Sequence, residues 1–122
     1  MRRALAVLAL VLCTVGLTGC GDDDSSDAGD GKDLPTKTID VTITDDSVTP
    51  NGDRVSVQVN QPIVLVVKAG ADGEIHVHSD PEHELEYGAG TTTLPPFTID
   101  KPGIVTVESH ALEKTIVQLE VK

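Results

Sequence analysis

Apolar and polar residues alternate along most of the chain after residue 36. The stretch 38–44 reads Thr-Ile-Asp-Val-Thr-Ile-Thr, and the stretch 54–59 reads Arg-Val-Ser-Val-Gln-Val. A repeat of two residues places every apolar side chain on one face of a β-strand. The same alternation, or a short apolar run, predicts further strands over 63–69, 74–79, 91–99, 103–109 and 114–122.

Two of these predicted strands have special features. Residues 63–69 are almost continuously apolar, so we expect them to form a central, buried strand. Pro95 and Pro96 interrupt the strand predicted over 91–99, because proline cannot donate a ladder hydrogen bond.

Turn-forming residues separate the predicted strands at short intervals. Pro, Gly, Asn and Asp cluster at 50–53, 70–73 and 101–103. No segment of sufficient length has the period of a helix. Short strands with frequent turns and a core of Val, Ile and Leu are typical of an all-β sandwich or barrel. We therefore predict one all-β domain over 36–122.

The first 35 residues have a different pattern. Arg2 and Arg3 precede an apolar run over 4–15, which has the length of a secretory signal and is short for a membrane span. The sequence Leu-Thr-Gly-Cys at 17–20 resembles a bacterial lipobox, after which the chain is cut and the new terminal cysteine is lipidated. We predict a lipoprotein signal peptide over 1–19. Cys20 would then carry acyl chains such as palmitate and hold the protein on the extracytoplasmic face of the cell membrane.

An acidic linker is predicted to follow Cys20, over 20–35. Its residues 21–33 are Gly, Ser and Asp with one Ala and one Lys, a composition typical of a flexible tether. The remaining residues, 34–122, hold six basic and fourteen acidic side chains, which is a formal charge of −8. An acidic surface argues against nucleic acid as a partner and is compatible with attracting cations.

Two histidines in the strand predicted over 74–79 are candidate metal ligands. His76 and His78 are two residues apart, so a β-strand points both side chains to the same side as Glu74, away from the apolar Ile75 and Val77. Two imidazoles at this spacing can bind one metal ion.

Two more histidines could join this pair. His110 follows the strand predicted over 103–109, and His83 lies in a predicted loop five residues after His78. Three imidazoles with an open position suit Cu(II) and, less well, Zn(II). Neighbouring carboxylates, among them Asp80 and Glu82, could complete the coordination or orient an imidazole.

Three blocks of the chain resemble small bacterial cupredoxin-like domains, over most of 36–122. They are VTPNGDRVSVQVNQPIVLVVKAG, then GEIHVHS, then FTIDKPGIVTVESHALEKTIVQLEV. The resemblance implies a Greek-key β-sandwich of about seven or eight strands. It also implies that the histidine-bearing strand and the loop after 103–109 meet at one end of the sandwich. Related domains occur in exported proteins that handle copper or iron.

The resemblance does not extend to blue-copper chemistry. Blue-copper sites need a cysteine thiolate, two histidines and usually a methionine. Ser109 stands near the position where that cysteine is expected, and residues 34–122 contain neither Cys nor Met. We therefore predict a protein that is not a blue-copper electron carrier.

Two other interpretations remain open. The histidines can form a polar stripe that pairs with neighbouring acids, which would leave a metal-free adaptor for another protein of the cell envelope. The spacing of Gly70, His76, His78 and Glu82 also fits the first half of a cupin metal motif, but the second half is missing. A small cupin-type metalloenzyme is thus the minor alternative, and our expectation is a metal-binding domain that is not an enzyme.

Overall fold

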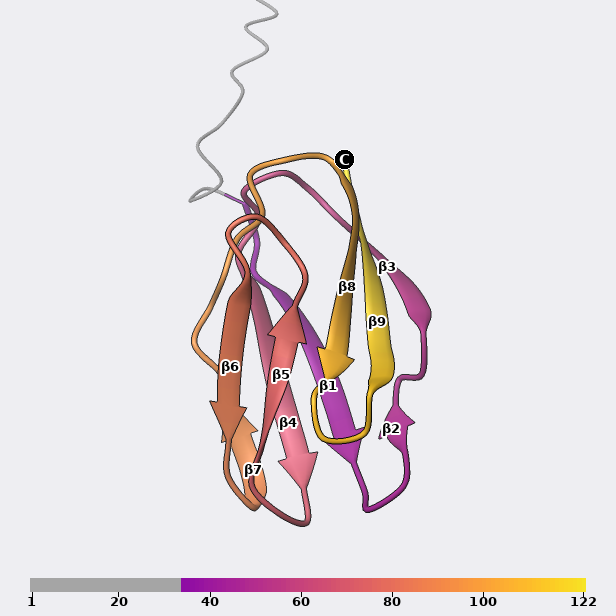
Figure 1. The fold of residues 1–122 in the computed structure, drawn as a ribbon. Helices are drawn as coiled ribbons and strands as arrows, with labels where there is room; N and C mark the ends of the chain where they lie inside the picture. The colour runs from indigo at the N-terminus through magenta and orange to yellow at the C-terminus, as the bar shows by residue number, and fades with distance from the viewer. Residues whose placement is uncertain (1–33) are drawn as a thin grey trace, which may run out of the picture.

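The computed structural model describes residues 34–122. The predictions for the signal peptide, Cys20 and the acidic linker up to residue 33 lie outside this part of the chain. Nine strands follow one another in the described part (Figure 1): β1 (Lys37–Ile43), β2 (Val48–Thr49), β3 (Asp53–Val57), β4 (Ile63–Ala69), β5 (Gly73–Val77), β6 (His83–Tyr87), β7 (Gly90–Thr93), β8 (Gly103–Ser109) and β9 (Lys114–Val121). None of these residues belongs to a helix with the length and apolar character that crossing a membrane requires.

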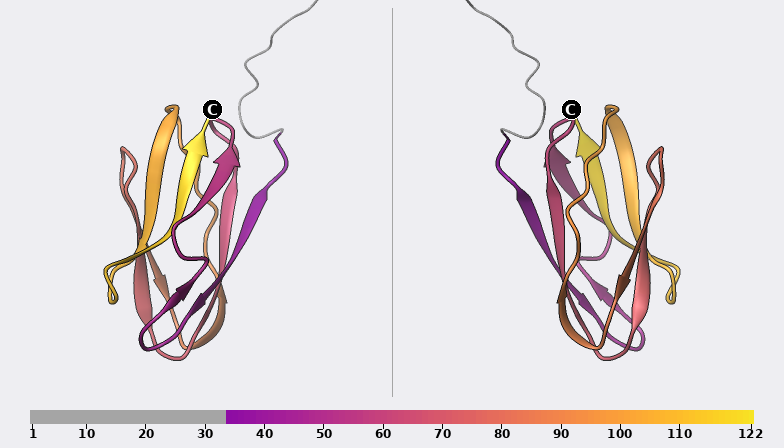
Figure 2. Two further views of the ribbon diagram at one scale, coloured as in Figure 1. Left: turned by 90° about the vertical axis from the view of Figure 1, so that its right-hand side faces the viewer. Right: turned by 90° about the vertical axis from the view of Figure 1, so that its left-hand side faces the viewer.

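The strands form two sheets that pack face to face (Figure 2). One sheet has the order β2-β1-β4-β7, and the other has the order β3-β9-β8-β5-β6. The pairs β1–β4 and β3–β9 are parallel, and the remaining neighbours are antiparallel. The predicted all-β sandwich is confirmed, with nine strands where about seven or eight were expected.

The alternating pattern builds the core between the sheets. In β1, Ile39, Val41 and Ile43 are buried, and the residues between them are exposed. Ile63, Leu65 and Val67 of β4 are fully buried. Burying one such side chain contributes about 1.5–3 kcal/mol relative to leaving it in water. The strand β4 is central in its sheet, as predicted, but Val64 and Val66 stay half-buried and Lys68 is exposed, because the sheet packs through one face.

The alternating pattern missed two strands, β2 and β6, and it predicted one strand, over 91–99, that is too long. The strand β2 has only two residues, and β6 has the sequence His-Glu-Leu-Glu-Tyr, in which only Leu85 and Tyr87 are apolar. The predicted loop at His83 is therefore wrong. The strand predicted over 91–99 ends at Thr93, and beyond the two prolines only Phe97 forms an isolated bridge, with Ile63.

Candidate metal site

The outer face of β5 carries the first two residues of the candidate site. The strand lies between β8 and β6 in the five-stranded sheet. Ile75 and Val77 have no exposed surface, whereas Glu74 and His76 are half-buried on the opposite face. This is the orientation that the period of two residues predicts.

The turn after β8 presents His110 beside that face. Ser109 pairs with Ile75, and the His110 amide donates a hydrogen bond of 3.0 Å to the Glu74 carbonyl oxygen. This bond extends the pairing of β5 and β8 by one residue and places the His110 side chain across from Glu74. The Glu113 amide donates back to the His110 carbonyl oxygen at 3.4 Å, and Glu113 has a left-handed backbone with φ of 50°. Backbone hydrogen bonds thus hold both ends of the turn that carries His110.

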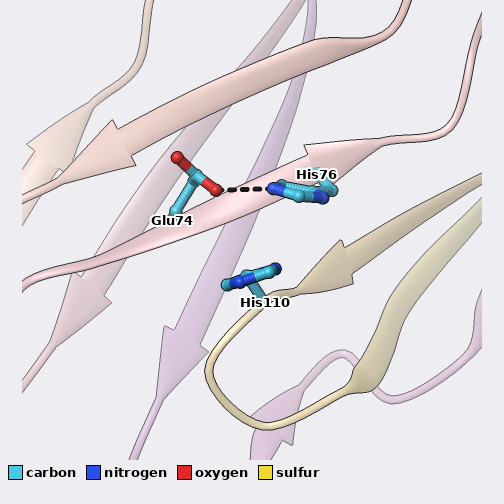
Figure 3. Close-up of side chains that lie close together, drawn as sticks. All are labelled: Glu74, His76 and His110. Atoms are coloured by element: carbon cyan, nitrogen blue, oxygen red, sulfur yellow. Dashed lines mark hydrogen bonds and ion pairs between the residues drawn. The ribbon is translucent and has the colours of Figure 1, made fainter.

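Glu74, His76 and His110 converge (Figure 3). Each offers one ligand atom, and these three atoms lie within 4.8 Å of one another. His76 Nε2 is 2.5 Å from Glu74 Oε1, and the His76 and His110 rings have centroids 4.5 Å apart. Two imidazoles and a carboxylate are donors that both Zn(II) and Cu(II) accept. A single metal ion could therefore be held by residues from β5 and from the turn after β8.

Carboxylates surround His76. The hydrogen bond to Glu74 raises the pKa of His76 above its usual 6.5; partial burial opposes this shift, and the charges of Glu74, Glu84 and Glu82 add to it. Glu84 of β6 and Glu108 of β8 are the direct cross-strand neighbours of His76. The imidazole therefore lies in a strongly negative environment, which favours any cationic partner.

This acidic face lacks lysine and arginine partners within residues 34–122. The ion pairs of Glu74, Glu82, Glu84 and Glu108 are with histidines only. In addition, Glu74 pairs directly with Glu86 across β5 and β6, where two like charges are unfavourable. The sequence analysis did not single out Glu84, Glu86 and Glu108. The alternation of Glu84 and Glu86 with Leu85 and Tyr87 was the signal for two of them.

The other two predicted ligands lie elsewhere. The His78 ring is 6.1 Å from the His76 ring and is not part of the group with Glu74 and His110. His83 pairs with Val77 at the start of β6, so it shares the inward side of Val77, and its ring lies 5.4 Å from that of Phe97. The structure therefore brings His76 and His110 together, leaves His78 beside them and places His83 on the other face.

The histidine-bearing strand and the turn after 103–109 meet, and they bring His76 and His110 together. Glu74, His76 and His110 lie on the outer side of the five-stranded sheet (Figure 3). Ser109, near the position expected for a blue-copper cysteine, is fully buried on the inner side. Even a thiol at that position would face away from His76 and His110, because successive residues of a strand point to opposite faces.

Comparisons with known proteins show the fold. No family model and no curated protein matches the chain. Among solved structures, a laccase from Pediococcus acidilactici Pa5930 is similar with a TM-score of 0.55 at 17% identity, over 77% of this chain and 28% of the laccase. A multi-copper oxidase from Pediococcus acidilactici is similar with a TM-score of 0.52 at 17% identity, over 75% of this chain and 27% of the oxidase. The domain is thus a cupredoxin-like β-sandwich, and it spans less than a third of either oxidase.

These comparisons also correct one expectation. The sequence analysis predicted that the protein is not an enzyme, but both similar structures are oxidases that contain this fold. The fold consequently provides no ground for excluding an enzyme. At 17% identity the likeness identifies no reaction either.

Proposed function

We propose that this protein is an exported, lipid-anchored domain that binds a divalent transition metal ion, preferably Cu(II), through Glu74, His76 and His110. The observation that carries the proposal is the convergence of three ligand atoms within 4.8 Å, from β5 and from the turn after β8. The lipobox at 17–20 supports Cys20 as the anchor on the extracytoplasmic face of the membrane. In that place the domain would buffer, deliver or sense the metal.

The charge distribution favours a metal ion over a simple polar stripe. An ordinary solvated face would pair its acids with lysine or arginine, as Lys122 does with Glu120 at 3.2 Å. The face around His76 instead sets Glu74 directly opposite Glu86. Like charges in this arrangement oppose folding, and a divalent cation bound to Glu74 would offset their repulsion.

The donor set and the exposure of the site favour Cu(II). Copper(II) binds nitrogen and oxygen donors more tightly than the other divalent metals of its row, including Zn(II). A surface groove of about 730 Å³ begins at Glu74 and His110 and is lined further by Gly73, Tyr87 and Ala111. One side of a bound ion would therefore stay open, which suits exchange of the ion with another molecule.

Calorimetric titration of the purified protein with Cu(II), and separately with Zn(II), tests the proposal. Replacing a ligand, as in His76→Ala or His110→Ala, is expected to weaken Cu(II) binding by at least about tenfold. His83→Ala is the matched control, because it removes a histidine on the opposite face, and it should leave the affinity unchanged. Equally weak binding by the wild type and His76→Ala would remove the metal site and leave the metal-free adaptor.

The anchor has its own test. Replacing Cys20 with alanine removes the thiol that would carry the acyl chains, so the protein should no longer sediment with the membrane fraction of the cells that export it. Cys13→Ala is the matched control, since this cysteine lies within the predicted signal peptide. An unchanged membrane fraction for Cys20→Ala would contradict the lipid anchor.

A further inference from the structure

His78 lies between two carboxylates outside the group formed by Glu74, His76 and His110. Its Nδ1 is 3.2 Å from Glu82 Oε1, and its Nε2 is 3.4 Å from Glu108 Oε2. Glu82 belongs to the segment between β5 and β6, whereas Glu108 projects from β8. The two acids thus approach the ring from different elements of the sheet.

The two carboxylates favour a positive charge on or beside the His78 ring. A neutral imidazole has one N–H donor and one lone pair, and a carboxylate can only accept hydrogen bonds. If Nε2–H donates to Glu108, the Nδ1 lone pair faces the Glu82 oxygen. A cation between Nδ1 and Glu82 removes that repulsion, and it can be either a proton or a metal ion. Among the ion pairs of residues 34–122, no lysine or arginine reaches Glu82 or Glu108 to supply the positive charge instead.

The tautomer with Nε2–H on Glu108 is the one that metal-binding histidines commonly use. A ligating imidazole usually donates its other N–H to a carboxylate or carbonyl, which orients the ring and makes the free nitrogen a better ligand. Glu108 is placed to accept that hydrogen bond, and Glu82 is placed to share the ion bound at Nδ1.

Glu82 also links His78 to the first site. The same oxygen, Oε1, lies 4.0 Å from His76 Nδ1, while His76 Nε2 faces Glu74. The two nitrogens of His76 therefore face two different carboxylates, and the ring lies between the two sets of donors. With the rings of His76 and His78 centred 6.1 Å apart, ions bound on the two sides of His76 would be close neighbours.

We propose that the protein binds a second divalent metal ion, through His78 Nδ1 and Glu82, directly beside the ion held by Glu74, His76 and His110. Glu108 acts as a positioning residue that holds the His78 ring. This inference rests on the proposed function. The second ion binds more weakly than the first, because its donors are fewer and His78 is an exposed residue.

Native mass spectrometry and calorimetry of the full chain with Cu(II) provide the test. The wild type should take up two ions in two steps at saturation. His78→Ala and Glu82→Gln should each abolish the second step and leave the first step in place. His78→Ala keeps every carboxylate near His76, so of the two variants it should change the affinity of the first step less. Glu108→Gln should weaken the second step by about tenfold or more, and it should affect the second step more than the first. His83→Ala should retain both steps.

A second readout depends on the distance between the ions. Two Cu(II) ions a few ångströms apart couple magnetically, so the electron paramagnetic resonance signal of the two-copper wild type should be broader or weaker than twice that of His78→Ala with one copper. Uptake of one ion by the wild type at excess Cu(II) would overturn the second site and leave the proposed function intact. Retention of two ions by His78→Ala would overturn the ligand assignment, and uptake of none by the wild type would overturn both proposals.

Discussion

The two faces of the five-stranded sheet differ along β5 and β8. The inner face stabilises the fold, and the outer face carries the candidate metal ligands. On the inner face, Ile75, Val77 and Val107 have no exposed surface. On the outer face, the residues next to Ile75 and Val77 are Glu74 and His76, and Glu108 follows Val107. The backbone ladder is shared, so the difference lies in the side chains alone. The inner face holds the sheets together, and the outer face concentrates negative charge that the fold does not need.

Another part of the same outer surface shows that this concentration is local. On β3 and β9, Arg54 contacts Gln118 at 3.4 Å, and at the end of the chain Lys122 pairs with Glu120 at 3.2 Å. There the cations contact polar or acidic side chains, as is usual for a solvated sheet. Around His76, the acids instead meet only histidines or one another. Such contacts with lysine or arginine are missing around His76 within residues 34–122, and the proposed binding of a cation would account for the difference.

The largest expected effect is the loss of an inner side chain. Ile75→Ala leaves a cavity in the core and should lower the free energy of unfolding by about 2–5 kcal/mol, measured by urea denaturation. Just after β5, the exposed His78 offers the contrast: His78→Ala should change the free energy of unfolding by less than about 0.5 kcal/mol without metal. Similar losses for the two variants would mean that the faces are not divided in this way.

Binding of a metal ion on the outer face should stabilise the folded protein. At a free Cu(II) concentration of one hundred times the dissociation constant, the free energy of unfolding should rise by about 2.7 kcal/mol, because the ion binds only the folded state. Thermal unfolding with and without Cu(II) measures the shift. At the same Cu(II) concentration His110→Ala should gain no more than about 1.4 kcal/mol, because its affinity is expected to be at least about tenfold lower. A shift of equal size in His110→Ala would show that the ion acts elsewhere.

Acid should weaken metal binding earlier than an ordinary histidine would. The pKa of His76 is raised above 6.5 by the hydrogen bond to Glu74 and by nearby acids. Its proton therefore competes with the metal from a higher pH, and affinity should fall as pH decreases, by up to about tenfold per unit below that pKa. Calorimetric titrations at several values between about pH 8 and pH 5.5, the range in which histidines usually titrate, measure the affinity for Cu(II). An affinity that stays constant over this range would argue against His76 as a ligand.

A smaller effect is expected from Ser109 on the inner face. Its hydroxyl is buried and has no hydrogen-bond partner among the described residues. Burial raises the pKa of Tyr87, which keeps that phenol neutral. Ser109→Ala removes the unpaired hydroxyl and should stabilise the protein by about 1 kcal/mol in urea denaturation. Copper affinity should not change, and a loss of affinity would contradict the separation of the faces.

The smallest expected effect tests the repulsion between Glu74 and Glu86. Glu86→Gln removes one of two like charges that face each other and should stabilise the metal-free protein by about 0.2–1 kcal/mol. The gain should shrink when Cu(II) is bound, because the ion already offsets the repulsion. Glu120→Gln is the matched control: it removes a glutamate that pairs with Lys122, so no gain is expected. If both variants gained equal stability, the cause would be the lower overall negative charge of the protein and not the repulsion between Glu74 and Glu86.

Much of the fold was determined by the sequence alone. The period of two residues assigns each side chain of a strand to one face, so the burial of Ile75 and Val77 and the outward position of Glu74 and His76 follow from the order of residues. The turn residues set the lengths of the strands in the same local way. The prediction failed at β6, because this five-residue strand holds only two apolar residues, Leu85 and Tyr87.

Only the tertiary structure decided which residues meet on the outer face. The pairing of β5 with β8, in a register that sets His110 across from Glu74, joins segments far apart in the chain. The same is true of the carboxylates of β6 and β8 beside His76. The position of His83 depends on its pairing with Val77, which turns it inward. Residue order specifies the face of a strand through local geometry, whereas the neighbours on that face depend on which strands pair and in which register.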